Sequence, residues 1–319
     1  MLPSETAGRR NGATGASPID AYVIVGKDSA SGGLRIEENA WPKRIRRRTC
    51  RLSRRFERLE SIVPTETNAR DATIAATFPI EEPLMAVWAI ADLHLTFARP
   101  ESRERYAARW RDHAVKVERE WRAVVAPGDL VLVPGDVSMA RNHRDLQPDL
   151  DWLERLPGTK ILSPGNHDVW FNGVAKIRPM LRPSLRVVGG DALATHGAVV
   201  CGTRGAPRLD DDPTPAEAAE SDRELAALDA ALEAAAALRN GGEPLFVLWH
   251  YPPFDPHRRP GPCVDRLERA DVTACVYGHL HAEGQWSLAV QGVIHGVRYA
   301  CVAADAVGFR PLRIDGSRR

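Results

Sequence analysis

The sequence predicts an α/β protein built on a largely parallel sheet. From Met85 onward, short apolar runs rich in strand-forming residues alternate with stretches of helical periodicity, a pattern typical of strands joined by crossover helices. Polar side chains follow several of these runs directly, as expected where parallel strands end at one edge of a sheet. With 319 residues, the chain is long enough to bury a core without disulfide bonds.

The predicted strands are short runs, several of them bounded by turn-forming residues. Those before His281 are Ala86–Ala91, Leu130–Val133, Lys160–Leu162, Val199–Cys201, Leu245–Trp249 and Val272–Tyr277. After His281 the runs are more closely spaced, roughly Val297–Ala303 and Phe309–Ile314. We expect these later strands to form a second sheet that packs on the first.

Two helices are indicated by apolar spacing and by capping signals. Between the first two strands, six apolar residues recur three and four positions apart, as on one face of a helix: Tyr106, Trp110, Ala114, Val117, Trp121 and Val124. We interpret the two tryptophans as core residues. A second helix begins at a capping box, Thr214 to Glu217, with Pro215 at its first position, and is closed by residues 240–242, Asn-Gly-Gly. Its apolar stripe should lie on the body of the protein and consists of Leu225, Leu228, Leu232 and Ala235.

The first 84 residues differ in composition from the remainder. No sustained helical or strand period appears before Pro83, and nine basic residues lie between Lys43 and Arg58. Such a run can bind nucleic acid or anionic lipid, but the composition favours a solvated, partly disordered tail. We therefore divide the chain into a basic extension, residues 1–84, and a folded domain, residues 85–319. An upstream misreading of the start codon is the alternative origin of the extension.

Composition and charge exclude several classes of protein. The net charge is +1, with 27% charged and 44% hydrophobic residues, which is typical of a globular chain. No apolar run approaches the about 18 residues of a membrane span, and the first residues lack the apolar segment of a signal peptide. The five cysteines contain no C-x-x-C pair. We expect a cytoplasmic protein with reduced cysteines and no membrane partner.

Five predicted strands run directly into residues that commonly bind metals. The residues are Asp92, His94, Asp136, Asn166, His167, Asp168, His250, His279 and His281. Because the carboxyl ends of parallel strands line one crevice, these residues would converge from distant parts of the chain. The recurrence at five strand ends carries the prediction, since a single histidine or aspartate there is usually structural. We assign surface or structural roles to the other histidines: His113, His143, His196, His257 and His295.

A glycine immediately precedes the first candidate ligand in three of these clusters. The glycines are Gly135, Gly165 and Gly278. Glycine tolerates the positive φ and the close backbone approach that a chain needs to leave a sheet sharply and present the next side chain. We expect both properties at these positions.

The donor types indicate which metals the site would bind. Imidazole, carboxylate and amide oxygen without thiolate disfavour a structural zinc site and suit Mn, Fe, Zn or Co. The candidates are too many for one ion, whereas two divalent metal ions that share a bridging carboxylate account for seven ligands. Such a cationic centre attracts a phosphate ester and stabilises charge on its oxygens.

The motifs D-x-H, G-D, G-N-H-D, a solitary His after an apolar strand and G-H-x-H, in this order, resemble the calcineurin-like metallophosphoesterase superfamily over about residues 85–315. The resemblance implies a four-layer α-β-β-α sandwich with a dimetal centre above the strand ends. The stretches GDVSMARN and GNHD depart from the protein Ser/Thr phosphatases of this superfamily. The stretches CGTRG and HYPPFDP are more similar to a bacterial group of predicted phosphohydrolases.

Carried over by position, the resemblance implies a role for each candidate. One metal would be held by Asp92, His94, Asp136 and His281. The other would be held by Asp136, as the bridge, with Asn166, His250 and His279. His167 would lie near the leaving group as proton donor or charge stabiliser, and Asp168 would orient the His167 ring.

The implied activity is hydrolysis of a phosphomonoester or phosphodiester by a hydroxide held between the metals. Arg204 is a candidate phosphate clamp, because a guanidinium fits phosphate oxygens with two hydrogen bonds; a surface or salt-bridged arginine is an equal alternative.

Two other functions stay open. One is a nuclease or nucleic-acid-associated phosphodiesterase that uses Lys43 to Arg58. The other is a non-catalytic metal-binding scaffold, which the presence of every expected ligand disfavours.

Overall fold

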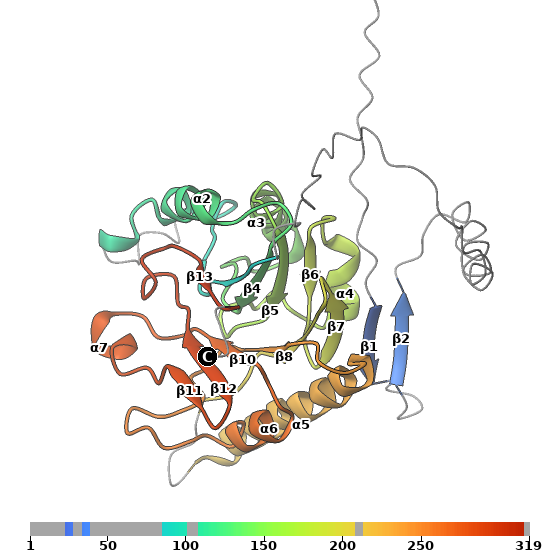
Figure 1. The fold of residues 1–319 in the computed structure, drawn as a ribbon. Helices are drawn as coiled ribbons and strands as arrows, with labels where there is room; N and C mark the ends of the chain where they lie inside the picture. The colour runs from blue at the N-terminus through green and yellow to red at the C-terminus, as the bar shows by residue number, and fades with distance from the viewer. Residues whose placement is uncertain (1–22, 28–33, 39–84, 101–107, 208–212, 316–319) are drawn as a thin grey trace, which may run out of the picture.

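A computed structural model describes residues 85–100, 108–207 and 213–315, together with the backbone of two short strands at 23–27 and 34–38. Two multistranded sheets pack face to face, and helices cover their outer faces. Figure 1 shows α2 and α3 on one side of the molecule and α5 and α6 on the other, with the sheets between them. This arrangement agrees with the predicted four-layer α-β-β-α sandwich.

The smaller sheet has five strands in the order β13-β3-β4-β5-β6. Four of them are parallel, and β13 lies antiparallel to β3 at one edge. The strands are β3 (Val87–Ala89), β4 (Leu130–Pro134), β5 (Thr159–Ser163), β6 (Leu185–Val187) and β13 (Leu312–Arg313). Strand β4 is buried along its whole length, as expected for an apolar run covered on both faces.

The larger sheet has eight strands in the order β11-β12-β10-β9-β8-β7-β1-β2. Its centre is parallel, and its two edges are antiparallel. The strands are β1 (Val23–Lys27), β2 (Leu34–Glu38), β7 (Asp191–Thr195), β8 (Ala198–Thr203), β9 (Leu245–Trp249), β10 (Ala274–Tyr277), β11 (Gly292–Ile294) and β12 (Val297–Cys301).

Three apolar clusters hold the layers together. The inner faces of the two sheets bury a shared cluster that includes Leu130, Leu132, Phe246 and Leu248. A second cluster joins the five-stranded sheet to α2 (His113–Val124) and α3 (His143–Glu154). A third joins the larger sheet to α5 (Pro215–Leu238) and α6 (Val264–Arg269). The remaining helical segments are η2 (Ala108–Trp110), α4 (Val174–Ile177), η3 (Arg178–Met180) and α7 (Glu283–Trp286).

The predicted strands are present within one to three residues of their expected ends, but their division between sheets was predicted wrongly. Strands β11 and β12 extend the sheet that contains β9 and β10, whereas β13 pairs with β3 in the other sheet. The two sheets instead separate between β6 and β7, in the middle of the folded domain. Strand pairing is set by contacts between distant segments, which the local pattern of apolar residues does not contain.

The second predicted helix matches α5 closely. The side chain of Thr214 accepts a hydrogen bond from the Glu217 backbone N–H, and the Glu217 carboxylate accepts one from the Thr214 backbone N–H. Leu228 and Ala235 of the predicted stripe are fully buried on the larger sheet. The first predicted helix begins later than its apolar pattern: α2 starts at His113, and Trp110 lies on the short η2 turn before it.

The expectation that no strand precedes Pro83 is wrong. Strand β1 pairs antiparallel with β7, and β2 pairs antiparallel with β1, so this early segment extends the larger sheet (Figure 1). The basic run from Lys43 to Arg58 lies outside the described residues. The division at residue 84 stays a prediction. Among the described helices, none combines the length and the apolar character required to cross a bilayer.

Trp121 tests the packing of α2 on the five-stranded sheet. Its side chain is fully buried, and its indole N–H donates to the Pro157 carbonyl at 2.9 Å. We expect Trp121→Ala to lower the free energy of unfolding by about 3–5 kcal/mol, because it leaves a cavity and an unpaired carbonyl. Val115→Ala on the same helix, where the side chain is 69% exposed, should change it by less than about 0.5 kcal/mol. Urea unfolding of both variants measures the difference, and equal effects would contradict this packing.

Candidate metal centre

The carboxyl ends of β3, β4 and β5 meet those of β9 and β10 at one edge of the sandwich. The chain after β3 joins the two sheets there, because Ala91 donates to the Val302 carbonyl at 2.7 Å and accepts from Ala304 at 3.0 Å. The next residue, Asp92, donates its backbone N–H to the Gly135 carbonyl at 3.0 Å. The loops that carry the candidate ligands are thus tied to one another across the sheets.

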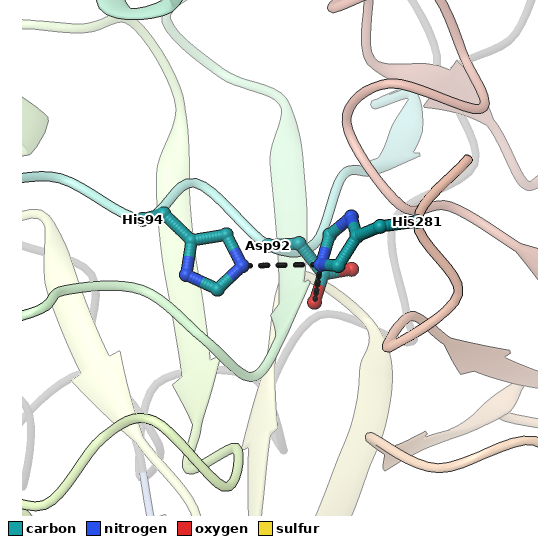
Figure 2. Close-up of side chains that lie close together, drawn as sticks. All are labelled: Asp92, His94 and His281. Atoms are coloured by element: carbon teal, nitrogen blue, oxygen red, sulfur yellow. Dashed lines mark hydrogen bonds and ion pairs between the residues drawn. The ribbon is translucent and has the colours of Figure 1, made fainter. Parts of the chain in front are cut away.

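Asp92, His94 and His281 form one group with the geometry of a metal site. One ligand atom from each lies within 4.8 Å of the others. The two Nε2 atoms of His94 and His281 are 3.1 Å apart, and His281 Nε2 is 3.5 Å from Asp92 Oδ1. Figure 2 shows both imidazole rings turned toward the Asp92 carboxylate. Asp92 and His94 are buried, whereas His281 is partly exposed.

Asp92, Asp136 and His250 form a second such group. His250 Nε2 lies 3.5 Å from Asp136 Oδ2 and 2.8 Å from Asn166 Oδ1. His279 Nδ1 reaches the same Asn166 oxygen at 3.0 Å, so the predicted ligands Asn166 and His279 adjoin this group. All three members of the group are buried.

The geometry suits two neighbouring cations that share a carboxylate. Asp92 belongs to both groups of ligands. Asp136 Oδ2 also lies between them, at 3.8 Å from His94 Nε2 and 3.5 Å from His250 Nε2. Its other oxygen accepts a hydrogen bond from the His167 backbone at 2.8 Å. The placement of Asp136 therefore fits the bridging role that the family resemblance implies.

The tautomer of His250 leaves a lone pair directed into the centre. His250 Nδ1 lies 3.1 Å from the Pro134 carbonyl, to which only an N–H can donate, and the neutral ring then presents the Nε2 lone pair to Asp136 and Asn166. His281 Nδ1 lies 3.2 Å from Asp305 Oδ1 and its Nε2 lies 3.5 Å from Asp92 Oδ1, so without a cation both nitrogens of this ring face a carboxylate that can accept from them. Converging lone pairs of nitrogen and oxygen repel one another unless a cation lies between them, so the donor set fits metal ions.

The shifted pKa values of the buried groups also indicate that the centre suits a cation. Burial, together with the charges of Asp168 and Asp92, raises the pKa of Asp136 to about 9. Burial lowers the pKa of His250 to about 4. Burial opposes the charge on His281, but hydrogen bonds to Asp305 and Asp92 outweigh it and raise the pKa of His281 to about 10. Carboxylates buried this close together need a proton or a metal ion to balance them.

The three predicted glycines are required for close packing. A Cβ on Gly165 would collide with the Asp136 carboxylate, one on Gly278 with the Asp92 carboxylate, and one on Gly135 with the His250 ring. Only Gly135 has a positive φ, of 89°. The predicted positive φ is therefore wrong for Gly165 and Gly278, where space rather than backbone freedom requires glycine.

Asp168 does not orient His167, which corrects the expected role. Among the described residues, its carboxylate accepts from the backbone N–H groups of Val137, Ser138 and Gly165 at 2.8–3.2 Å and from the Trp170 indole at 3.0 Å. These bonds hold the loops after β4 and β5 together. Burial raises the pKa of Asp168 to about 6.

His167 lies at the exposed side of the centre. Its ring packs edge-on against His94, with 5.3 Å between ring centroids, and its side chain is exposed. Partial burial and the nearby His281 lower the pKa of His167. When protonated, such a ring can give a proton to a substrate oxygen.

Asp305 is a site residue that the sequence analysis missed. It is buried, binds His281 Nδ1 through Oδ1 and accepts from the Ala282 backbone at 3.2 Å through Oδ2. It therefore sets the orientation of the His281 ring. The signal that would have found it is the same as for the predicted ligands, because the apolar run that contains β12 leads directly into Asp305.

Arg204 lies beside the centre but is already paired. Its guanidinium forms ion pairs with Glu220 and with Glu224, the latter at 3.2 Å. It also lines a cavity of about 400 Å³ that reaches the centre at Asn166. The salt-bridged alternative describes this arginine better than a free phosphate clamp does, although its position leaves it able to contact a substrate in the cavity.

Two solved structures are similar to this chain. A phosphopantetheinyl hydrolase (PptH) from Mycobacterium tuberculosis has 18% sequence identity and a TM-score of 0.42, over 73% of this chain and 96% of that chain. The protein of unknown function AQ665 from Aquifex aeolicus has 13% identity and a TM-score of 0.38, over 72% of this chain and 95% of that chain. No curated protein matches the sequence.

The calcineurin-like phosphoesterase family model matches residues 85–283. This range contains all seven predicted metal ligands, from Asp92 to His281. It also contains His167, Asp168 and Arg204. The chain belongs to the calcineurin-like phosphoesterase family, and it is a metal-dependent hydrolase of phosphate esters.

Proposed function

We propose that the protein hydrolyses a phosphomonoester or phosphodiester at a centre of two divalent cations. The observation that carries this proposal is the pair of ligand groups that share Asp92, with histidine ring nitrogens directed into both. The ligands we assign are those expected from the sequence: Asp92, His94, Asp136, Asn166, His250, His279 and His281.

When bound, two such cations would supply Lewis acidity, a water of lowered pKa and compensation for the charge of the phosphoryl group. The protein residues position these cations. Asp92 and Asp136 fix the positions of the ligand groups relative to each other, since each reaches both sides of the centre. The mixed imidazole and carboxylate donors suit Mn, Fe or Zn.

His167 is the residue we assign to proton transfer. Its exposed ring lies at the mouth of the centre beside His94, and its own backbone N–H is held by Asp136 at 2.8 Å. A substrate phosphoryl group at the centre would place its leaving oxygen within reach of this ring. His167 would donate a proton to that oxygen as the bond to phosphorus breaks.

Two other candidate functions have no supporting observation among the described residues. A nucleic-acid-associated activity depends on Lys43 to Arg58, which lie outside them. A non-catalytic scaffold would not need three histidine rings to meet at two buried carboxylates, with a fourth ring at the adjoining Asn166 oxygen. A phosphate-ester substrate is therefore the partner we propose.

Asp136→Asn tests the metal centre. Asparagine keeps the size of the side chain and an oxygen that accepts from the His167 backbone, but it removes the negative charge between the two ligand groups. We expect turnover of p-nitrophenyl phosphate and bis-p-nitrophenyl phosphate to fall by at least about 100-fold, with near wild-type folding by circular dichroism. Asp222→Asn, at an exposed position of α5, is the control and should keep full activity. Retained activity in Asp136→Asn would contradict the assignment.

His167→Ala tests proton transfer to the leaving group. Loss of the proton donor should lower kcat by about 100- to 10,000-fold for alkyl esters, which are poor leaving groups, and much less for p-nitrophenyl esters. Metal content should stay at the wild-type value because His167 is not an assigned ligand. His257→Ala, at an exposed position on the loop after β9, is the control. An equal loss for good and poor leaving groups would exclude the acid role.

Arg204→Gln tests whether this side chain contacts the substrate. If the cavity that Arg204 lines receives the organic part of the ester, KM should rise about tenfold with little change in metal content. Arg266→Gln is the matched control, because Arg266 is also paired with a carboxylate, Asp229 at 2.8 Å, but is not among the residues that line the cavity. An unchanged KM across a series of esters would leave Arg204 with a purely structural role.

A further inference from the structure

The turn that carries Asp92 and His94 has an unfavourable backbone conformation. Both residues have positive φ, of 58° and 41°, in the left-handed region that residues with a Cβ rarely adopt. Each such residue costs about 1–3 kcal/mol, and it persists only where the surroundings hold it. Backbone bonds to the loop after β4 hold one side of the turn, because Asp92 donates to Gly135 and His94 donates to Asp136.

His113 holds the other side of the turn. Its Nε2 lies 2.9 Å from the carbonyl of Leu93, the residue between Asp92 and His94. Its Nδ1 lies 3.1 Å from the carbonyl of Trp110, so the ring donates to both carbonyls at once when both of its nitrogens carry a proton. The His113 side chain is buried at the first position of α2, so a helix anchored in the core reaches the metal-binding turn through this ring.

Trp110 packs against two of the assigned metal ligands. Its indole meets the His94 ring edge-on at 5.7 Å between centroids and the His281 ring at 5.3 Å. A third ring, Phe309, supports it from another side at 5.3 Å. Trp110 is only 6% exposed, so its ring has little room to move. Figure 2 shows the His94 and His281 rings that this indole contacts, side by side at Asp92.

The two residues also contact each other. The His113 and Trp110 rings are 5.3 Å apart, and the His113 ring binds the Trp110 carbonyl. We call this pair the α2 bracket. Through His113 it holds the main chain of one ligand turn, and through Trp110 it restricts the rings of His94 and His281.

We propose that the α2 bracket, His113 and Trp110, positions Asp92, His94 and His281 for one of the two metal ions. This inference rests on the proposed dimetal function. His113 and Trp110 touch neither metal nor substrate in this assignment and act through the ligands that they hold. Loss of a residue that orients metal ligands typically costs about 10- to 100-fold in metal affinity.

The two nitrogens of His113 can be tested separately. Glutamine places an amide N–H near the position of Nε2 and can keep the bond to the Leu93 carbonyl. Asparagine places its amide near Nδ1 and can keep only the bond to Trp110. If the Leu93 bond holds the ligand turn, His113→Gln should keep metal affinity and His113→Asn should lose it.

The experiment is a titration of metal-free full-length protein with Mn²⁺, followed by calorimetry and by the electron paramagnetic resonance of free Mn²⁺. Wild-type protein should bind two ions. In Trp110→Ala and His113→Asn, the affinity for one ion should fall about 10- to 100-fold, and the affinity for the other, whose ligand group shares Asp92, should fall less. His113→Gln should stay within about threefold of wild type. Trp110→Phe keeps a ring at the contact and should lie between Trp110→Ala and wild type.

Trp121→Phe is the matched control for a general loosening of α2, because Trp121 is buried on the same helix and contacts Pro157 rather than the ligands. It should lower the melting temperature without changing Mn²⁺ affinity.

Two results would overturn the bracket. One is an equal loss of affinity for both ions in Trp121→Phe and Trp110→Ala, and the other is wild-type binding in Trp110→Ala and His113→Asn. Retention in His113→Asn with loss in His113→Gln would overturn the role of the Leu93 bond. Binding of fewer than two ions by wild-type protein would instead overturn the proposed function.

Discussion

Asp92 and Asp136 are buried close together at the edge where the two sheets meet. The electrostatic repulsion between their carboxylates must be balanced by the groups around them. Without a cation, Asp136 retains a proton well above the usual pH range of a carboxyl group, because burial and the neighbouring Asp168 and Asp92 oppose its ionisation. Three histidine rings converge on these two carboxylates from both sheets, and the His279 ring lies beside them at Asn166. A protein without a cationic ligand would gain nothing from this arrangement, because the same volume filled with apolar side chains would be more stable.

The main chain is strained at the same place. Asp92, His94, Asp136 and His279 all adopt left-handed backbone conformations, with φ between 41° and 69°. Four such residues in one site represent a substantial conformational cost, which the packed layers on both sides must offset. Hydrogen bonds between the ligand loops and the four bonds accepted by Asp168 distribute that cost over the ends of several strands.

The ligands could be found from the sequence because each follows an apolar run, and the end of a run is a local property of the chain. The same rule would have identified Asp305, which follows the apolar run that contains β12 but was not included among the candidates. Other features depend on contacts between distant segments. Neither the pairing of β13 with β3 nor the bonds of Asp168 to the loop after β4 is visible in the local pattern. Trp110 was correctly predicted to be buried, but its contact with two metal-binding histidines arises only when η2 folds over the strand ends.

The pairing of β1 with β7 has a consequence for solubility. Ala192, Leu193 and Ala194 align with β1 in this ladder, and β1 is covered in turn by β2. A chain that began at Met85 would leave this side of β7 as an open edge, with unpaired amide and carbonyl groups next to a buried apolar strand. Open edges of this kind invite pairing between molecules and aggregation. The early hairpin therefore acts as a cover against self-association, whatever the remainder of the basic extension does.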